Sequence, residues 1–118
     1  MSYTIEKQFH LSYSHRLEGL PVGHKCARHH GHNAVIAVAL RAHTVDDVGF
    51  VVDYGDMKPI ETWLDKEFDH QHLNEVVEFN PTAELLAEYL FHVIEKLGYP
   101  VSRVGWSETP STWAWYEP

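Results

Sequence analysis

The sequence predicts an α+β domain in which two helices cover one face of a four-stranded antiparallel sheet. Three observations carry this prediction: alternating apolar patterning in two N-terminal segments, helical patterning in two central segments, and two short strand-like segments at the C-terminus. The element order is therefore β-β-α-α-β-β. Because 118 residues, 44% of them hydrophobic, suffice for one core, we expect a single domain over residues 1–118.

The first two strands follow from a period of two. From Tyr3 to His15 the odd-numbered positions are mostly apolar and the even-numbered ones polar, which indicates a half-buried strand. A second strand begins at His30, where the even-numbered positions continue as apolar residues to Leu40. Residues 17–29 form the loop between them.

Two helices and two short strands complete the pattern. A helix is expected from residue 54 or 56 to residue 68, and a clearer apolar stripe predicts a second helix ending near Gly98. Asn80 or Thr82 can cap its start, and Pro81 suits a first-turn position. Strands are expected at Val101 to Glu108 and at Thr112 to Glu117.

Charge and cysteine content limit the function classes. A formal net charge of -8 disfavours binding to nucleic acid or to an anionic membrane, so a bound phosphate would need the local basic cluster of Arg16, Lys25 and Arg28. The one cysteine cannot form an intramolecular disulfide, and the N-terminal residues do not resemble a secretion signal. We therefore expect a cytoplasmic protein, and no apolar stretch reaches membrane-spanning length.

Three histidines predict a metal centre. His30 and His32 lie two residues apart on a strand, so both face the apolar side, and His15 ends the apolar face of the preceding strand. If these strands pair antiparallel, the three imidazoles meet, which is the ligand set of a catalytic Zn²⁺ with an open fourth position. The alternative is that each is a core histidine satisfied by a backbone carbonyl.

Three further groups are candidates for chemistry. Cys26 has Lys25 and Arg28 nearby, and such a setting favours a reactive thiolate, although a lone cysteine is often only a small apolar residue. The adjacent Asp69 and His70 can form a general acid/base unit or belong to an ordinary surface loop.

The carboxylate of Glu108 shares a strand face with Val104 and Trp106, which is costly unless a donor meets it. Arg103, a backbone amide or the paired N–H groups of a flat heterocyclic ligand would each serve as that donor. The sequence leaves these possibilities open.

These residues, in this order, resemble the 6-pyruvoyl-tetrahydropterin synthase family over nearly the whole chain. The matching segments are Ser14-His15-Arg16-Leu17, Cys26-x-x-x-His30-Gly31-His32, Gly49 to Asp53, Leu64 through Asp69-His70 to Leu73-Asn74, Pro81-Thr82-x-Glu84 and Glu108-Thr109. No segment is decisive alone, but their joint order and spacing are specific.

The resemblance implies the T-fold, with subunits joined into an oligomeric barrel, commonly a homo-hexamer, and active sites between subunits. It implies Zn²⁺ on His15, His30 and His32. It further implies proton transfer by Cys26, Asp69 and His70, and a pterin anchor at Glu108. The implied substrate is the small molecule 7,8-dihydroneopterin triphosphate.

The three-residue spacer between Cys26 and His30 resembles the 6-carboxy-tetrahydropterin synthase branch, a lyase of queuosine biosynthesis that releases acetaldehyde and triphosphate. The pyruvoyl-forming branch typically has a longer spacer, and a third branch carries glutamate in place of this cysteine. A pyruvoyl-forming or related T-fold pterin enzyme is the alternative. A structural zinc-binding module with Cys26 as a fourth ligand is the non-enzyme alternative.

Overall fold

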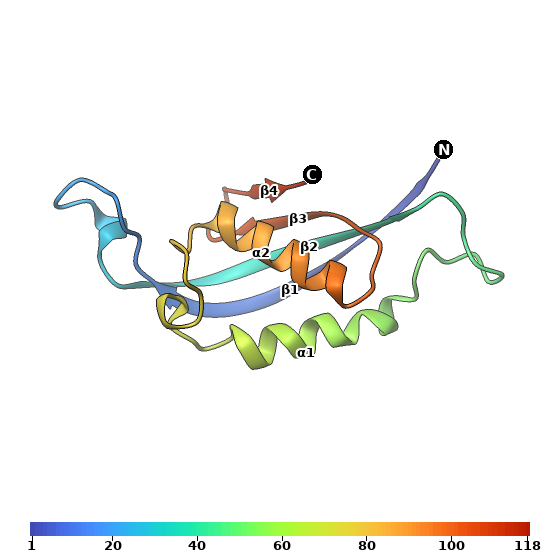
Figure 1. Ribbon diagram of the computed structural model, residues 1–118, viewed down its shortest axis with the longest axis horizontal. Helices are drawn as coiled ribbons and strands as arrows, with labels where there is room; N and C mark the ends of the chain where they lie inside the picture. The colour runs from blue at the N-terminus through green and yellow to red at the C-terminus, as the bar shows by residue number, and fades with distance from the viewer.

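The computed structural model describes residues 1–118 and has the predicted element order. Two long strands, β1 (Tyr3–His15) and β2 (His30–Ala42), precede helices α1 (Lys58–Glu67) and α2 (Ala83–Lys96), and strands β3 (Val101–Ser107) and β4 (Ala114–Tyr116) follow. The sheet is antiparallel with the strand order β1-β2-β3-β4. Both helices lie on one side of it, as Figure 1 shows.

The alternating pattern of the first two strands is confirmed. Phe9, Leu11 and Tyr13 are buried against the helices, together with the even-numbered residues of β2 from Ala34 to Leu40. The register pairs His15 with His30 and Tyr13 with His32. The antiparallel pairing expected from the sequence therefore brings the three histidines to one end of the sheet.

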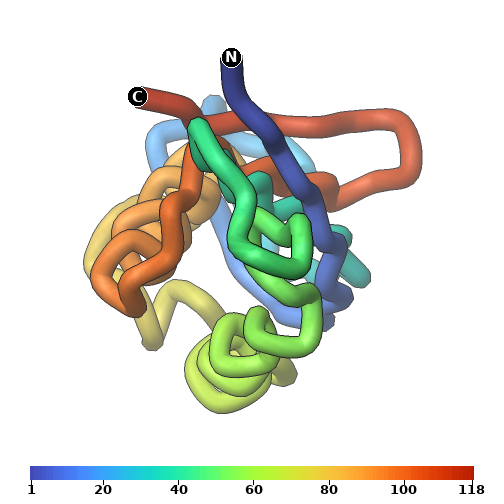
Figure 2. The backbone as a smooth tube through the Cα atoms, turned by 90° about the vertical axis from the view of Figure 1, so that its right-hand side faces the viewer, coloured from blue at the N-terminus to red at the C-terminus, as the bar shows by residue number.

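The molecule is elongated, with principal extents of 56 × 27 × 25 Å. The loop between β1 and β2 lies at one end, and the segment joining β2 to α1 lies near the N-terminus at the other (Figure 1). Viewed end-on, the β3–β4 connection projects away from the two helices (Figure 2). None of the helices is long and apolar enough to cross a membrane.

Helix boundaries differ slightly from the prediction. The expected first helix divides into a 3-10 turn, η2 (Tyr54–Met57), and α1, with a proline in the first helical turn. At α2 the Thr82 side chain is the N-cap and accepts a hydrogen bond from the Leu85 amide at 3.2 Å. Placing Pro81 in the first turn was wrong, because Pro81 precedes the cap, where its carbonyl is free to bond elsewhere.

The C-terminal strands are shorter than expected. β3 ends at Ser107, one residue before Glu108, and only residues 114–116 of the last segment pair with it. Gly105 pairs with Trp115. Any larger residue at position 105 would place its Cβ atom within 2.7 Å of the Trp115 ring, so only glycine fits against the ring in this position. The ring also stacks against the Arg103 guanidinium, 4.5 Å from its centroid. Trp115 therefore packs on the sheet face that the helices leave uncovered, whereas the Tyr116 ring contacts Phe91 of α2 at a centroid distance of 5.2 Å.

Candidate metal centre

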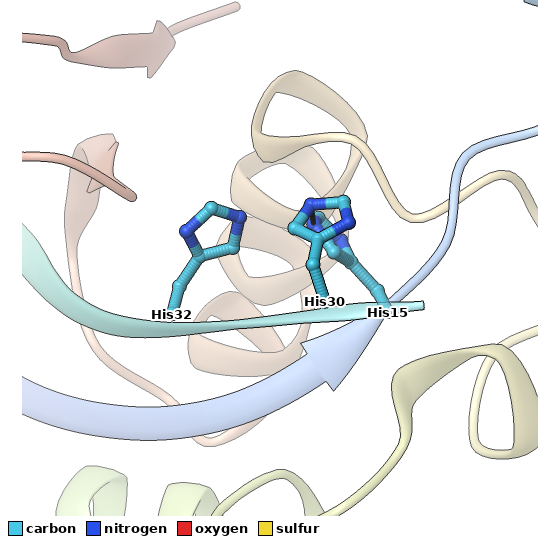
Figure 3. Close-up of side chains that lie close together, drawn as sticks. All are labelled: His15, His30 and His32. Atoms are coloured by element: carbon cyan, nitrogen blue, oxygen red, sulfur yellow. Dashed lines mark hydrogen bonds between the residues drawn. The ribbon is translucent and has the colours of Figure 1, made fainter. Parts of the chain in front are cut away.

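The three predicted histidines converge on one point. Their ligand nitrogens all lie within 4.8 Å of one another, and the Nε2 atoms of His15 and His30 are 3.0 Å apart. Figure 3 shows the rings of His30 and His32 rising from β2 beside that of His15, which comes from the end of β1. The two paired strands thus supply all three imidazoles within one chain.

Backbone carbonyls fix the tautomers of two of these rings. Nδ1 of His15 lies 2.8 Å from the Pro81 carbonyl oxygen, and Nδ1 of His30 lies 2.7 Å from that of Arg28. Because a carbonyl only accepts, each Nδ1 donates its hydrogen, and in the neutral rings each Nε2 presents a lone pair. This arrangement of an imidazole held by a carbonyl is typical of metal-bound histidine.

Two lone pairs that face each other at 3.0 Å repel unless a proton or a metal cation lies between them. A tetrahedral metal with nitrogen ligands needs nitrogens about 3.3 Å apart, which is close to this separation. The donor set is therefore suited to a divalent metal, with histidine nitrogen as its ligand.

Burial keeps His15 neutral, as a metal ligand must be. The side chain is fully buried, and desolvation lowers the pKa of His15 below its usual range. The Pro81 carbonyl and the Glu108 carboxylate oppose this shift, while His30 and His32 add to it. Near neutral pH the ring is therefore unprotonated at Nε2.

The Glu108 carboxylate lies beside the histidines. Its Oε2 atom is 3.3 Å from Nε2 of His15 and 3.4 Å from Nε2 of His32. Its protein donor is none of the groups expected from the sequence but the Tyr13 hydroxyl, at 2.8 Å. Arg103 instead pairs with Glu6 at 3.4 Å.

Tyr13 is itself bonded to a third side chain. The indole Nε1–H of Trp106 donates to the Tyr13 hydroxyl at 2.9 Å. Burial raises the pKa of Tyr13, and the adjacent Glu108 carboxylate raises it further, so the phenol stays protonated. The apolar positions at 13 and 106 were visible in the sequence, but their polar atoms gave no periodic signal.

Cys26 lies in the loop between β1 and β2 and stands outside the group of ligand nitrogens. It occupies a 3-10 turn, η1 (Lys25–Ala27), that contains no buried residue. The turn is held by the His24 imidazole, which accepts from the Cys26 amide, and by a bond from the Leu17 amide to the Cys26 carbonyl. The thiol is partly exposed, and no hydrogen bond joins it to an imidazole.

Asp69 and His70 form the expected pair. Nδ1 of His70 lies 2.8 Å from the Asp69 carboxylate, whose other oxygen accepts the Ser12 amide at 3.0 Å. That backbone bond is the main reason why the pKa of Asp69 is lowered. His70 has a φ of 59°, the only positive φ at a residue other than glycine. Strained backbone of this kind concentrates at functional sites.

A surface cavity of about 570 Å³ lies where β1 and β2 meet the segment that follows α1. Tyr13 and His32 line it from the strands, and His70 lines it from the segment that follows α1. The other lining residues are Ser12, Ser14, Gly31, Asn33, Gln71 and His72. Of the predicted site residues, His32 and His70 line this cavity, whereas His15, His30 and Asp69 do not.

Two asparagines fix the chain just beyond His15, and sequence reasoning gave them no role in holding the site. Asn74 accepts from the Arg16 amide and donates to the Arg16 carbonyl, at 2.8 and 2.9 Å. Asn80 makes the same pair of bonds to Glu18, at 2.9 and 3.1 Å. Each asparagine side chain makes the two backbone hydrogen bonds that a neighbouring strand would otherwise make. No short-range sequence pattern reveals this role.

Comparison with known proteins identifies the fold and the family. The sequence model of the 6-pyruvoyl tetrahydropterin synthase family matches residues 4–118. A protein of Archaeoglobus fulgidus is 35% identical over 95 residues, which cover 80% of this chain and 81% of that protein. The 6-carboxy-5,6,7,8-tetrahydropterin synthase of Rickettsia bellii is 31% identical over 117 residues, covering 76% of this chain and 85% of the relative.

Comparison with a solved structure supports the same fold and family. The 6-pyruvoyl tetrahydropterin synthase of Caenorhabditis elegans superposes with a TM-score of 0.86 at 31% identity, covering 100% of this chain and 96% of that one. The T-fold implied by the sequence resemblance is thereby confirmed. The chain belongs to the 6-pyruvoyl tetrahydropterin synthase family.

Proposed function

We propose that this protein is a zinc-dependent 6-carboxy-5,6,7,8-tetrahydropterin synthase. It would convert 7,8-dihydroneopterin triphosphate to the carboxy product with release of acetaldehyde and triphosphate, a lyase reaction of queuosine biosynthesis. The observation that carries the proposal is the convergence of three imidazoles at one end of the sheet, with the Nε2 atoms of His15 and His30 only 3.0 Å apart, which suits a metal ion held between them. Relatives named as this synthase, from Rickettsia bellii and Bacillus subtilis, support the product.

The metal ligands in this proposal are His15, His30 and His32, a donor set that suits Zn²⁺ with one position left for substrate. When bound, the metal supplies Lewis acidity to oxygens of the substrate side chain. The carbonyls of Pro81 and Arg28 keep two of the rings oriented with Nε2 toward the centre.

Proton transfer is assigned to two groups. Cys26, with Lys25 and Arg28 near it in sequence, would act as a thiolate base on the substrate side chain. The Asp69–His70 pair would move a proton at a second position, with the ionised Asp69 orienting the His70 ring at Nδ1. A thiolate at Cys26 requires a reducing compartment, which fits the cytoplasmic location expected from the sequence.

Substrate binding is assigned to Glu108 and to the basic loop. Glu108 would accept the N–H groups of the pterin ring, because its Oε1 atom makes no hydrogen bond within the protein. Lys25 and Arg28 are exposed and form no ion pair, so they remain available for the triphosphate. Arg16 is already paired with Glu18 at 3.4 Å.

The proposal includes a homo-oligomer with active sites at subunit contacts. Both edges of the sheet are largely open: β1 has 13 residues with one partner strand and is covered on its other side only at Ser12 and Ser14, by residues 70–72, and β4 ends the opposite edge. Open edges pair readily with another chain. The stacked, partly exposed rings of Trp115 on β4 and of Trp113 just before it add apolar surface for such a contact.

Product analysis tests this function. Zinc-loaded protein would be incubated with 7,8-dihydroneopterin triphosphate, and the products identified by mass spectrometry. A carboxy-tetrahydropterin with acetaldehyde supports the proposal, and a pyruvoyl product assigns the chain to the alternative branch. A protein that binds zinc but leaves the substrate intact would favour a structural zinc-binding module.

A further inference from the structure

Three polar side chains behind the histidine centre form a chain of hydrogen bonds with one possible direction. Trp106 donates to the Tyr13 hydroxyl at 2.9 Å, and the Tyr13 hydroxyl lies 2.8 Å from Oε2 of Glu108. Indole nitrogen only donates and an ionised carboxylate only accepts. The single Tyr13 proton must therefore point toward Glu108.

This chain holds one oxygen of the carboxylate and leaves the other free. Oε2 takes the Tyr13 hydrogen bond and lies beside His15 and His32, whereas Oε1 has no partner in the protein. Each carboxylate oxygen has two lone pairs, so Oε2 keeps acceptor capacity while it is anchored. A carboxylate fixed in this way presents a defined edge to a ligand with two parallel N–H groups.

The packing makes Tyr13 a firm support. Its side chain is almost fully buried, and its ring contacts those of His15, His32 and Trp106 at centroid distances of 5.3, 5.8 and 5.9 Å. Tyr13 and Trp106 lie on β1 and β3, with β2 between them. On β2, Tyr13 is paired with His32 and Trp106 with Ile36, and the small Ala34 lies between these two positions on the same face.

We propose that Tyr13, oriented by Trp106, is a positioning residue that sets the carboxylate of Glu108 for recognition of the pterin ring. The inference rests on the proposed role of Glu108 as the ring anchor. It adds two residues to the site and predicts that both act only through Glu108. Ordered hydrogen bonds of this kind are needed to hold a binding group in its productive orientation.

A double-mutant cycle on ligand binding tests the proposal. Binding of neopterin, a pterin without phosphate, would be measured by calorimetry for the parent, Tyr13→Phe, Glu108→Ala and the double variant. Tyr13→Phe should weaken binding about tenfold, because a hydrogen bond to a charged group is lost. In the Glu108→Ala background the same change should have no further effect. Zinc content, measured by mass spectrometry of the metal, should be unchanged in all four proteins.

A matched control removes the same hydroxyl elsewhere. Tyr99 donates to the Asp56 carbonyl, far from the histidines in the chain and outside the site, so Tyr99→Phe should leave neopterin binding unchanged. If Tyr13→Phe folds poorly because the Trp106 indole loses its acceptor, Trp106→Phe takes its place. That variant keeps the Tyr13–Glu108 bond but removes its orientation, and should weaken binding severalfold only when Glu108 is present.

The outcomes separate this inference from the proposed function. Weaker binding in Glu108→Ala with no change in Tyr13→Phe overturns the positioning role and leaves the anchor intact. Equal losses of neopterin affinity from Tyr13→Phe with and without Glu108 also overturn the positioning role, since they indicate a general structural defect. Unchanged binding in Glu108→Ala removes the anchor itself and with it the positioning role.

Discussion

The three imidazoles and the Cys26 thiol lie at the same end of the molecule but are supported very differently. His15 is fully buried, and its ring is fixed by the Pro81 carbonyl. Cys26 lies in a turn with no buried residue, tied to the rest of the chain by the bond from the Leu17 amide. The contrast indicates that the candidate metal site is built into the folded chain, whereas the proposed base lies on a loop with few buried contacts.

Removing the imidazoles should have the largest effect. The double variant His30→Ala, His32→Ala is expected to lose its zinc, from about one ion per chain to none, because one remaining histidine cannot hold the metal. Turnover should disappear with it. Elemental analysis of the purified proteins measures this, with His29→Ala as the matched control that keeps the three ligands. Full zinc occupancy in the double variant would exclude the proposed ligands.

Replacing the loop cysteine should lower the turnover rate without changing the zinc content. Cys26→Ala is expected to retain zinc and the parental assembly state, while turnover at saturating substrate falls about a hundredfold to ten-thousandfold, the usual cost of removing a general base. Steady-state kinetics and light scattering on the same samples check both parts. A variant that turns over the substrate at the parental rate would disprove the base assignment but not the metal centre.

A smaller effect is expected when the helix cap next to the His15-binding carbonyl is removed. Thr82 caps α2 directly after Pro81, so Thr82→Ala should lower the free energy of unfolding by about 1 kcal/mol. Because the carbonyl of Pro81 holds His15, zinc affinity should fall as well. Thermal melts with and without zinc measure the two changes, and Thr82→Ser, which restores the hydroxyl, should recover both. Equal losses in the serine variant would show that the cap is not responsible.

The smallest effect concerns Asp69. Its pKa is lowered in the folded chain, chiefly by the Ser12 amide, so the ionised group stabilises the fold above its unfolded pKa near 3.8. That contribution is lost as the pH falls through the folded value. Asp69→Asn should therefore cost a few tenths of a kcal/mol at neutral pH and nothing in acid. Denaturant unfolding across this range checks the sign, and a deficit that grows in acid would contradict it.

Much of this site follows from the sequence because it depends on local periodicity. His30 and His32 face one way since they are two apart on a strand, and His15 ends an equally regular strand. Antiparallel pairing of consecutive strands then brings them together, as the observed register confirms. The roles of Cys26, Asp69, His70 and Glu108 remain predictions, which come from their local sequence settings and from the family resemblance.

What the sequence did not reveal depends on long-range geometry. The donor to Glu108 is Tyr13, 95 residues away, and it reaches the carboxylate because β1 and β3 flank the same strand. The carbonyl of Pro81 meets His15 only because the cap of α2 falls at Thr82. No pattern of apolar residues contains either fact, because both concern individual polar atoms whose positions follow from packing.

We propose that the metal centre consists of imidazoles alone and keeps a position open. Cobalt(II) substituted for zinc reports its ligands directly, because thiolate ligands give intense charge-transfer absorption that nitrogen and oxygen ligands lack. Protein loaded with about one cobalt per chain should show the bands of nitrogen and oxygen coordination and no thiolate band, both alone and with bound neopterin. A thiolate band in either state would make Cys26 a fourth ligand and contradict the open catalytic site.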